Sequence, residues 1–342
     1  MRNMFVILLS QLFAPCLLAQ GLAFKMQEVD RTLQVGYCVV IADVNSDQKP
    51  DIVIADAQRV IWLENPTWKL RTILQGQTKP DNVSLAARDI DGDGQVDFAL
   101  AADWRGVSNT RTGGTLQWLK RGKSLEEPWQ MIPIADDIPT IHRIRFAQLM
   151  ESTRPELLVV PLMGRGTSAE KNWSERGVEI QTFSIPAQPE RDRWPRLVMD
   201  QSLLAVHNFE PVKLLTPKHQ QLLLATYDGL FLMRRYEEAG LLSWRMQKLG
   251  EGDQSQPQKS RGCSEVKLGW LAPGKPVIAT IEPWHGDQVV LYEPSENDWE
   301  KPWKRTVLDK ELKWGHALAW ADLNGDGKQE LVVGVRDTLH TQ

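Results

Sequence analysis

Three short stretches of this sequence carry oxygen-bearing side chains at a spacing that suits a hard divalent cation. In each stretch, acidic or amide side chains occupy positions 1, 3, 5 and 9 of a nine-residue loop, and an apolar run follows. Ca²⁺ takes about six to eight oxygen ligands, and a tight turn presents alternate side chains to one centre. The stretches therefore predict Ca²⁺ (or Mg²⁺) loops, with the ligands Asp43, Asn45, Asp47 and Asp51; Asp89, Asp91, Asp93 and Asp97; and Asp322, Asn324, Asp326 and Glu330.

The sixth position of each loop affects how easily the turn forms. Gly94 and Gly327 occupy it in two loops, whereas the loop that begins at Asp43 has Gln48 there. Glycine adopts positive φ angles without steric cost, and a side chain hinders that backbone conformation. We therefore expect the loop that begins at Asp43 to bind its cation more weakly than the loop that begins at Asp89.

The three loops belong to a longer repeat. Each unit contains β-branched and apolar runs separated by Gly, Pro, Asn and Asp, and helical periodicity is nearly absent. The last run of each unit carries a tryptophan, and these residues recur every 50 to 65 positions: Trp68, Trp129, Trp194, Trp244 and Trp303. Four strands per unit at this period predict an all-β fold, a β-propeller of four-stranded blades.

The sequence contains about five complete units and one partial unit. The sixth unit stops shortly after its second predicted strand, 331–335. Residues 24–30 resemble the fourth-strand pattern of residues 303–309, so we expect them to help complete the last blade. We predict one propeller domain over residues 20–342, truncated at its C-terminus relative to an intact ring.

Three of the six histidines share one position of the repeat. This position lies six residues before the start of each loop. We expect it to be on the innermost strand of the blade, on the face of the propeller opposite the loops. That position holds His142, His207 and His316 in three units, and the innermost strands of a propeller converge on its axis. Neutral imidazoles are good ligands for Zn²⁺, and three protein ligands with one open position are typical of catalytic zinc. A zinc site and simple hydrogen bonding within the channel both fit this register.

Further polar and aromatic residues are expected on the same face. They follow the second strands or lie on the innermost strands, and together they resemble a sugar site, in which aromatic rings stack and polar atoms bind hydroxyls. The expected substrate-binding residues are Trp104, Trp284, Asn82, Glu265 and Lys267, with Trp314 as a further pocket residue. His285 and Glu282 are the acid–base candidates, and Arg143 is the electrostatic clamp.

Charge and cysteine content exclude several classes of protein. The formal net charge is −4 and no basic block is present, so a nucleic-acid partner is not expected. The N-terminus has the pattern of an export signal over residues 1–19, with an apolar stretch shorter than a membrane span. We therefore expect a secreted or periplasmic protein with no membrane span after cleavage. Only Cys38 and Cys263 remain, too few for a disulfide scaffold.

Two resemblances follow from these motifs. The patterns DxDGDGxxDF and DxNGDGxxEL resemble FG-GAP or VCBS-type repeats, which form propellers with calcium loops. Longer phrases resemble the seven-bladed propeller domain of the aldos-2-ulose dehydratase (1,5-anhydro-D-fructose dehydratase) family. They are residues 80–83 (PDNV), 115–119 (TLQWL), 140–143 (TIHR), 160–166 (VPLMGRG), 281–286 (IEPWHG) and 312–317 (LKWGHA).

The second resemblance implies a propeller associated with zinc and a sugar ligand. In that family the propeller is joined to cupin domains, which this sequence does not contain. We expect an exported, calcium-stabilised propeller with a metal-assisted carbohydrate site in its channel, and a lyase that eliminates water from a keto-sugar. A non-enzymatic FG-GAP-type propeller that binds a glycan or a protein at the cell surface fits the same features.

Overall fold

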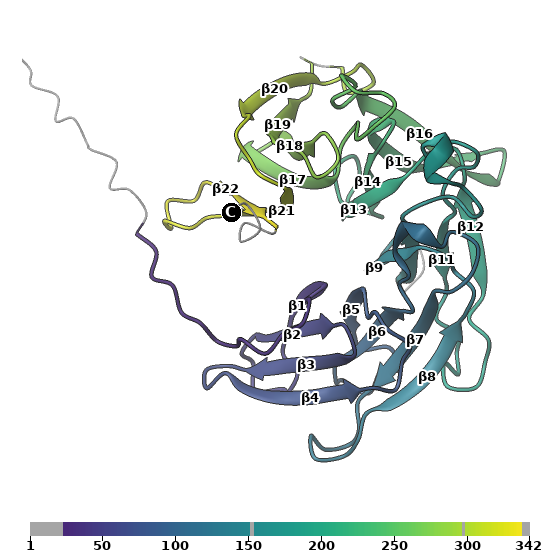
Figure 1. The fold of residues 1–342 in the computed structure, drawn as a ribbon, viewed down its shortest axis with the longest axis vertical. Coiled ribbons are helices and arrows are strands. Elements are labelled where there is room, and N and C mark those ends of the chain that lie inside the picture. The colour runs from purple at the N-terminus through teal and green to yellow at the C-terminus, as the bar shows by residue number, and fades with distance from the viewer. Residues whose placement is uncertain (1–22, 151–153, 296–297, 337–342) are drawn as a thin grey trace, which may run out of the picture.

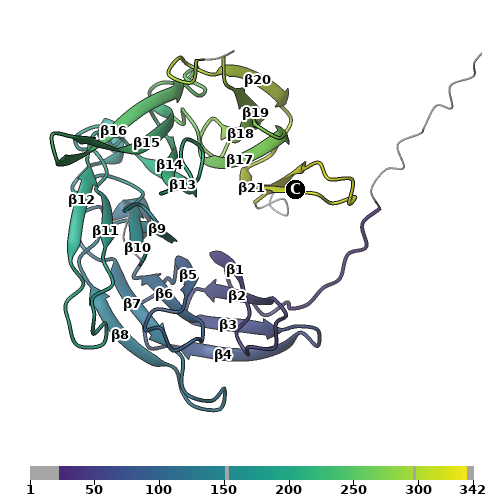
Figure 2. The same ribbon diagram turned by 180° about the vertical axis from the view of Figure 1, so that it is seen from behind.

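The computed structural model describes residues 23–150, 154–295 and 298–336. Its strands form five antiparallel sheets of four strands and a sixth sheet of two strands. Figures 1 and 2 show these sheets following one another around a central axis, in chain order. The only helices within the described ranges are the single turns Gly106–Ser108 and Ala169–Lys171. The predicted all-β propeller, with about five complete blades and a partial one, is confirmed.

The strand bounds show the repeat directly. The first three blades contain β1 (Cys38–Ala42), β2 (Asp51–Asp56), β3 (Arg59–Glu64) and β4 (Lys69–Gln75); β5 (Ser84–Arg88), β6 (Asp97–Ala102), β7 (Thr115–Lys120) and β8 (Gln130–Ala135); and β9 (Ile141–Ala147), β10 (Glu156–Pro161), β11 (Ile180–Phe183) and β12 (Arg196–Asp200). The others contain β13 (Val206–Val212), β14 (Gln221–Thr226), β15 (Gly229–Glu238) and β16 (Leu241–Gly250); β17 (Glu265–Ala272), β18 (Lys275–Glu282), β19 (Gln288–Glu293) and β20 (Lys304–Asp309); and β21 (Gly315–Ala321) with β22 (Glu330–Val335).

Apolar side chains hold neighbouring blades together. The second strands are almost continuously apolar because both of their faces are buried, as in β6 and β10. One core cluster joins the first two blades and includes Trp62, Phe98 and Trp129. Of the expected fourth-strand tryptophans, Trp129, Trp194 and Trp303 are buried in such clusters. Burying each large side chain contributes about 2–3 kcal/mol, so these residues act in packing.

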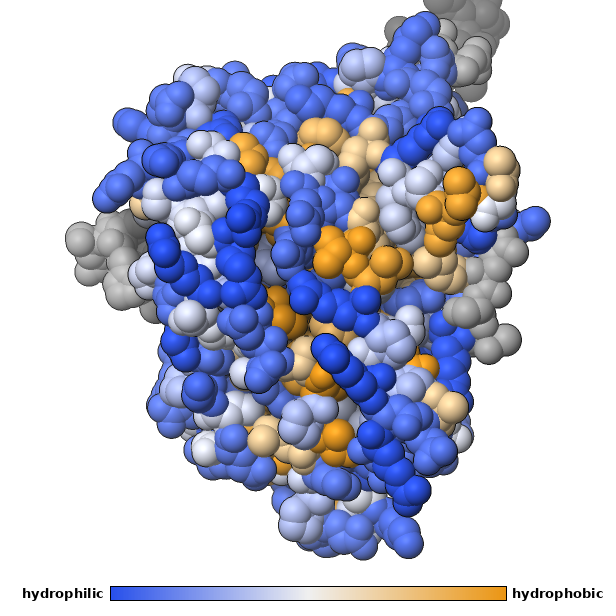
Figure 3. Space-filling model, turned by 90° about the vertical axis from the view of Figure 1, so that its right-hand side faces the viewer, coloured by the Kyte–Doolittle hydropathy of each residue, from blue (hydrophilic) through white to orange (hydrophobic). Residues whose placement is uncertain are grey.

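The outer strands cover the circumference of the ring. Figure 3 shows this side as largely hydrophilic, with separated apolar patches near its middle. The exposed apolar side chains on the outer strands include Leu197 and Val198 of β12 and Leu241 and Leu242 of β16. Scattered exposed groups of this kind are normal on a soluble surface and mark no site.

The two ends of the described chain differ from the other blades. The sixth sheet contains only β21 and β22, and Figure 1 shows it opposite the blade of β1 across an open part of the ring. Residues 24–30 form no strand, so the expectation that they help complete the last blade is wrong. The expected signal peptide, residues 1–19, lies outside the described residues. No helix within the described ranges has the length and apolar character that a membrane crossing requires.

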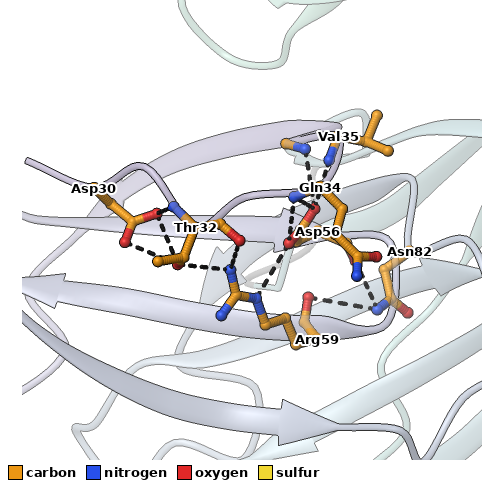
Figure 4. A network of polar contacts seen from close by, with 8 residues as sticks. Asp30, Thr32, Gln34, Val35, Asp56, Arg59 and Asn82 are labelled. Carbon is orange, nitrogen blue, oxygen red and sulfur yellow. Dashed lines mark hydrogen bonds and ion pairs between the residues drawn. The ribbon is translucent and has the colours of Figure 1, made fainter.

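A buried carboxylate fixes the segment that leads into the first blade (Figure 4). Asp56, at the end of β2, accepts hydrogen bonds from the backbone N–H groups of Gln34, Val35 and Gly36 and from Nε of Arg59. Arg59 in turn donates to the carbonyl and hydroxyl oxygens of Thr32. These contacts hold an extended segment, which has no sheet partner, against the first blade.

Candidate functional site

Three inner strands begin with the histidines that share a repeat position. His142, His207 and His316 are the second residues of β9, β13 and β21. A fourth histidine, His285, lies in the loop that follows β18. Because the starts of inner strands and the ends of second strands share one face of a meander sheet, all four imidazoles lie at the same end of the ring.

The structure brings three of these four imidazoles together. His207, His285 and His316 each offer a ring nitrogen, and these nitrogens lie within 4.8 Å of one another. Nε2 of His285 is 2.7 Å from Nε2 of His207. The ring centroid of His316 is 5.2 Å from that of His207 and 4.8 Å from that of His285. The resulting group, called here the imidazole centre, is drawn from three consecutive blades.

A tight turn positions His285 next to β21. The carbonyl oxygen of Gly286 accepts the N–H of Gly315, and the carbonyl oxygen of Asp287 accepts the N–H of Leu312. His285 itself has a φ of 50°, an uncommon backbone conformation for a residue with a side chain. A Cβ atom on Gly286 would lie 2.4 Å from the carbonyl oxygen of Glu282, so only glycine fits this turn. The turn therefore joins His285 to the start of the strand that carries His316.

Hydrogen bonds determine which nitrogen of His207 faces the centre. Nδ1 of His207 donates to the carbonyl oxygen of Ser264 at 2.8 Å and lies 3.2 Å from Oε1 of Glu265. The lone pair is therefore on Nε2, which faces His285. A histidine whose other nitrogen is held in this way has its ring orientation and tautomer fixed.

His142 does not belong to the imidazole centre. Its Nδ1 donates to the backbone carbonyl of His207 at 3.0 Å, and its ring packs at 5.2 Å from that of Trp104. Of the predicted group of His142, His207 and His316, the structure brings His207 and His316 together, with His285 in place of His142. The repeat register identified two members, and the third comes from a loop that the register does not include.

Burial keeps the imidazoles neutral. Burial lowers the pKa of His207 to about 3, with a further decrease from the nearby charge of Arg143. Burial and the neighbouring histidines lower the pKa of His285 to about 2 and that of His316 to about 4. The pKa of His142 is also lowered well below its usual value by burial. At neutral pH all four are free bases, the form of imidazole that binds metals.

A pocket of about 550 Å³ opens beside the imidazole centre. Trp284, His285 and the largely exposed Trp314 line it, together with polar groups that include Asp253, Ser255, Asp287, Gln288 and Lys313. Trp284 packs edge-on against His207 and Tyr227, with centroid distances of 4.7 Å to each. Of the expected tryptophans, Trp284 and Trp314 line this pocket, whereas Trp104 packs beside His142.

Glu282 does not fit the acid–base role that the sequence predicted. Its side chain has no exposed surface, and Oε2 accepts two hydrogen bonds from Arg305 at 2.9 and 2.8 Å. Oε1 accepts hydrogen bonds from Tyr292, Thr280 and the thiol of Cys263. The carboxylate points into its own blade and organises that blade, which a sequence pattern alone does not reveal.

Three of the predicted substrate-binding residues are also used within the fold. Asn82 is buried, donates to the carbonyl oxygen of Asp56 and accepts from Thr78. Glu265 is buried behind His207 and accepts a hydrogen bond from Asn208. Lys267 forms an ion pair with Glu210 at 3.2 Å. None of the three lines the pocket beside the imidazole centre. Arg143 does lie in the channel, next to His142 on β9.

One of the three acidic loops gathers its carboxylates. Oxygen atoms of Asp89, Asp91 and Asp97 lie within 4.8 Å of one another. Asp93 is directed to the backbone and side-chain nitrogens of Gln95, so it is not part of this group. Lys120 forms an ion pair with Asp91 at 2.8 Å. Among the described residues, the other two loops, which begin at Asp43 and Asp322, gather no such group of three carboxylates.

The ninth loop position has a structural role that the sequence interpretation missed. In five units its side chain accepts the backbone N–H of the second loop residue, at 2.8–3.2 Å. The five acceptors are Asp51, Asp97, Glu156, Gln221 and Glu330. Glu156 and Gln221 belong to loops that have lost the other acidic residues. In both of these loops the ninth position keeps its oxygen-bearing side chain. This pattern was the signal in the sequence that could have revealed the structural role.

Three parts of the chain match known family models. Residues 113–295 match the aldos-2-ulose dehydratase β-propeller domain, residues 43–100 match an FG-GAP-like repeat, and residues 314–337 match an FG-GAP repeat. A solved structure titled "Crystal structure of Nidogen/Laminin Complex" is 14% identical, covers 78% of this chain and 81% of its own, and has a TM-score of 0.39. The comparison with curated proteins returned no match. The chain belongs to the family of the aldos-2-ulose dehydratase β-propeller domain and carries FG-GAP repeats.

Proposed function

We propose that this propeller binds a carbohydrate at a divalent metal ion, such as Zn²⁺, held by His207, His285 and His316. One observation carries the proposal: three neutral imidazoles from three blades converge within 4.8 Å at the edge of a tryptophan-lined pocket. Three nitrogen ligands with one remaining position form the arrangement that lets zinc bind a ligand oxygen.

The chemistry of the donor set fits a metal. His207 presents Nε2 because its Nδ1 donates to the carbonyl oxygen of Ser264 and lies 3.2 Å from Oε1 of Glu265, and a carboxylate beside the second nitrogen is common behind zinc ligands. The 2.7 Å contact between Nε2 of His207 and Nε2 of His285 is a hydrogen bond, and loss of its proton would leave both nitrogens available to hold a metal. A bound metal would polarise a sugar oxygen as a Lewis acid.

The pocket supplies the groups that a sugar requires. Trp284 and Trp314 offer aromatic faces for the apolar side of a pyranose ring, and Asp253, Asp287 and Gln288 offer hydrogen-bonding atoms for hydroxyls. The positive φ of His285 supports a functional role, because backbone strain of this kind tends to occur at binding sites.

Metal content provides the direct test. The purified protein, loaded with Zn²⁺ and then dialysed, should retain one equivalent at the imidazole centre. Each of His207→Ala, His285→Ala and His316→Ala should weaken zinc binding more than about 100-fold, because direct ligands matter at least as much as the groups behind them. His219→Ala, a matched change outside the centre, should retain zinc. Equal zinc retention by all four variants would contradict the proposal.

Lyase activity is a second candidate, and family membership supports it. The reaction would be elimination of water from a keto-sugar, with an imidazole rather than Glu282 accepting the proton. Glu282 is hydrogen-bonded to Arg305 and Tyr292 and is not available as a base. This favours the alternative, a non-enzymatic module that binds a glycan or a protein. Turnover of 1,5-anhydro-D-fructose by the zinc-loaded protein would support the enzyme, and glycan binding without turnover would support the module.

We also propose that the loop from Asp89 to Asp97 binds Ca²⁺ as a structural ion. The clustering of Asp89, Asp91 and Asp97 supports this assignment. Burial raises the pKa of Asp97 to about 7, so its carboxylate lacks a compensating charge that a cation would provide. The ion would stabilise the hairpin between β5 and β6, far from the imidazole centre along the strand direction.

Export from the cytoplasm forms the last part of the proposed function. It rests on residues 1–19, where a positively charged start precedes an apolar stretch and a small residue at position 19. Detection of the mature protein beginning at Gln20 outside the cytoplasm would support it. A cytoplasmic protein that retains Met1 would contradict it.

A further inference from the structure

Arg143 has no carboxylate partner among the described residues. It follows His142 on the inner strand β9 and is partly buried. Its one hydrogen bond among the described residues is a long one, 3.4 Å, from Nη1 to the carbonyl oxygen of its neighbour His142. A guanidinium carries five N–H donors in a planar fork, so most of the donors of Arg143 are left for a ligand.

The neighbouring charged groups of the channel are paired, which makes Arg143 an exception. Arg145, two residues further along β9, donates to the carbonyl oxygen of Phe209 and to Oδ1 of Asn208, each at 3.1 Å. Lys267 is paired with Glu210 at 3.2 Å. The fold therefore satisfies Arg145 and Lys267 with hydrogen bonds or an ion pair, and it leaves Arg143 with one long hydrogen bond to the carbonyl oxygen of His142.

The position of Arg143 connects it to the imidazole centre. His142, the neighbour of Arg143 on β9, donates from Nδ1 to the carbonyl oxygen of His207 at 3.0 Å, and the centroids of the two rings are 5.0 Å apart. In addition to burial, the charge of Arg143 lowers the pKa of His207 and His316. Burial also lowers the pKa of Arg143 itself, and the partial compensation comes mainly from Glu265. A desolvated cation without a partner is costly, and an anionic ligand would remove that cost.

We propose that the ligand of the imidazole centre is an acidic sugar, a uronate, whose carboxylate pairs with the Arg143 guanidinium. The proposal rests on the proposed function in so far as it assumes a sugar at that centre. A carboxylate matches the planar fork of arginine with two parallel hydrogen bonds, whereas a neutral sugar offers single hydroxyls. Three neutral imidazoles and a metal would give the centre an excess of positive charge, which also favours an anion.

The loops on the same face carry more cationic groups. Arg111, Arg165 and Arg176 line a second pocket of about 390 Å³ together with Gly166 and Glu175, and Arg165 forms an ion pair with Asp137 at 3.2 Å. The loop that contains Arg165 contacts the loop beside the tryptophan pocket, because Asn172 donates to the carbonyl oxygen of Pro257. An acidic saccharide of several residues that begins at Arg143 would meet this second pocket.

The test compares two ligands that share one sugar ring, one with a charged carboxylate and one with a neutral methyl ester. Methyl β-D-glucuronoside and its methyl ester have the same ring, and calorimetry on the zinc-loaded full chain gives the affinity for each. The wild type should bind the acid about 10- to 100-fold more tightly than the ester, since hydrogen bonds to charged groups give this range. The preference should decrease as salt is raised.

Variants of Arg143 test whether its guanidinium binds the carboxylate of the sugar. Arg143→Gln should abolish the preference for the acid, and Arg143→Lys should restore part of it. Lys267→Gln, a matched loss of one positive charge in the same channel, should retain it, and circular dichroism confirms that each variant is folded. Equal affinities for acid and ester in the wild type, an unchanged preference in Arg143→Gln, or no binding of either glycoside at millimolar concentration would each overturn the proposal.

The two proposals fail in distinguishable ways. Zinc retention at the histidines with no acid preference would leave the metal centre intact and refute the uronate. An acid preference that depends on Arg143 in a protein that retains no zinc would support the uronate and refute the metal.

Discussion

At the scale of single residues, His207 depends on a carboxylate behind it. Glu265 is buried, one of its oxygens lies 3.2 Å from Nδ1 of His207, and that oxygen has no hydrogen bond of its own. The negative charge orients the ring and makes Nε2 a stronger donor to a metal. The same glutamate is thereby a positioning residue and not a ligand of the sugar.

Replacing this glutamate gives the first prediction. Glu265→Gln keeps the size of the side chain and removes its charge, so we expect zinc affinity to fall about 10- to 100-fold while the melting temperature of the metal-free protein changes little. Competition with a zinc chelator measures the affinity. Glu210→Gln removes a carboxylate from the neighbouring inner strand and should leave zinc affinity unchanged. An unaltered affinity in Glu265→Gln would contradict the assigned role.

Asp56 gives a prediction about acid stability. Burial alone would raise its pKa, but hydrogen bonds from Val35, Gln34 and other backbone groups lower the pKa from 3.8 to about 2. Because the folded pKa is the lower one, Asp56 stabilises the fold above about pH 4, and this contribution disappears as the pH falls towards 2.

Asp56→Asn should therefore lower the free energy of unfolding by about 1–2 kcal/mol at pH 7 and by much less at pH 2. Urea titrations at several pH values measure this difference. Asp30→Asn, which affects an exposed carboxylate of the same segment, serves as the control. A loss in Asp56→Asn that is equally large at pH 7 and pH 2 would show that charge is not responsible.

The residues of the site were only partly predictable. Repeat spacing identified His207 and His316, because equivalent positions of a radial repeat lie on the same strand of each blade and at the same distance along the propeller axis. The roles of Glu282, Asn82 and Glu265 were not predictable, since each depends on the direction of one side chain. Glu282 turns towards Arg305, a partner 23 residues further along the chain, and nothing local in the sequence indicates this pairing.

At the scale of elements, the acidic loops combine two separate functions. In five units the ninth residue closes the turn through the N–H of the second, whether or not the other oxygens are present. We propose that a cation binds where further carboxylates converge, as in the loop from Asp89 to Asp97. The sequence pattern predicts ions in three loops and does not separate these two functions. It did predict the unfavourable turn at Gln48, which has a φ of 67°.

The turn-closing function can be tested without any ion. Gln221 is buried and accepts hydrogen bonds from the N–H groups of Leu214 and Leu215. Gln221→Leu should lower the free energy of unfolding by about 1–3 kcal/mol, because it leaves buried donors without acceptors. The loss should be the same with Ca²⁺ and with EDTA, as measured by urea unfolding. Lys218→Ala, in the exposed part of the same loop, should change the stability little.

The ion-binding function gives the complementary prediction. A ligand that binds only the native state stabilises it by about 2.7 kcal/mol at a hundredfold excess over Kd. Ca²⁺ should raise the melting temperature of the wild type relative to EDTA, and Asp89→Asn should remove most of this difference. Asp43→Asn and Asp322→Asn, in loops that do not gather three carboxylates, should retain most of it. Equal melting temperatures with Ca²⁺ and EDTA in the wild type would show that the loops hold no stabilising ion.

At the scale of the whole molecule, the ring is a series of similar sheets with one small sheet at its end. In such repeats each sheet is stabilised mainly by its neighbours, so the end sheet opens most readily. The sheet of β21 and β22 packs against β17 and β18 and has many partly exposed residues. The number of blades was predictable from the repeat, but the position of residues 24–30 was not, because their pattern resembles a strand without forming one.

The position of His316 in this small sheet has a consequence for the timing of metal exchange. Of the three proposed ligands, His207 and His285 belong to four-stranded blades, and His316 would move whenever β21 separates from β17. We therefore expect zinc to slow the hydrogen exchange of the amides of β21 and β22 by a factor that grows with zinc concentration, and to leave β2 and β3 unaffected. Equal protection of β21 with and without zinc would contradict this coupling. The residence time of a metal at the imidazole centre would then be set by how often the smallest sheet of the ring opens.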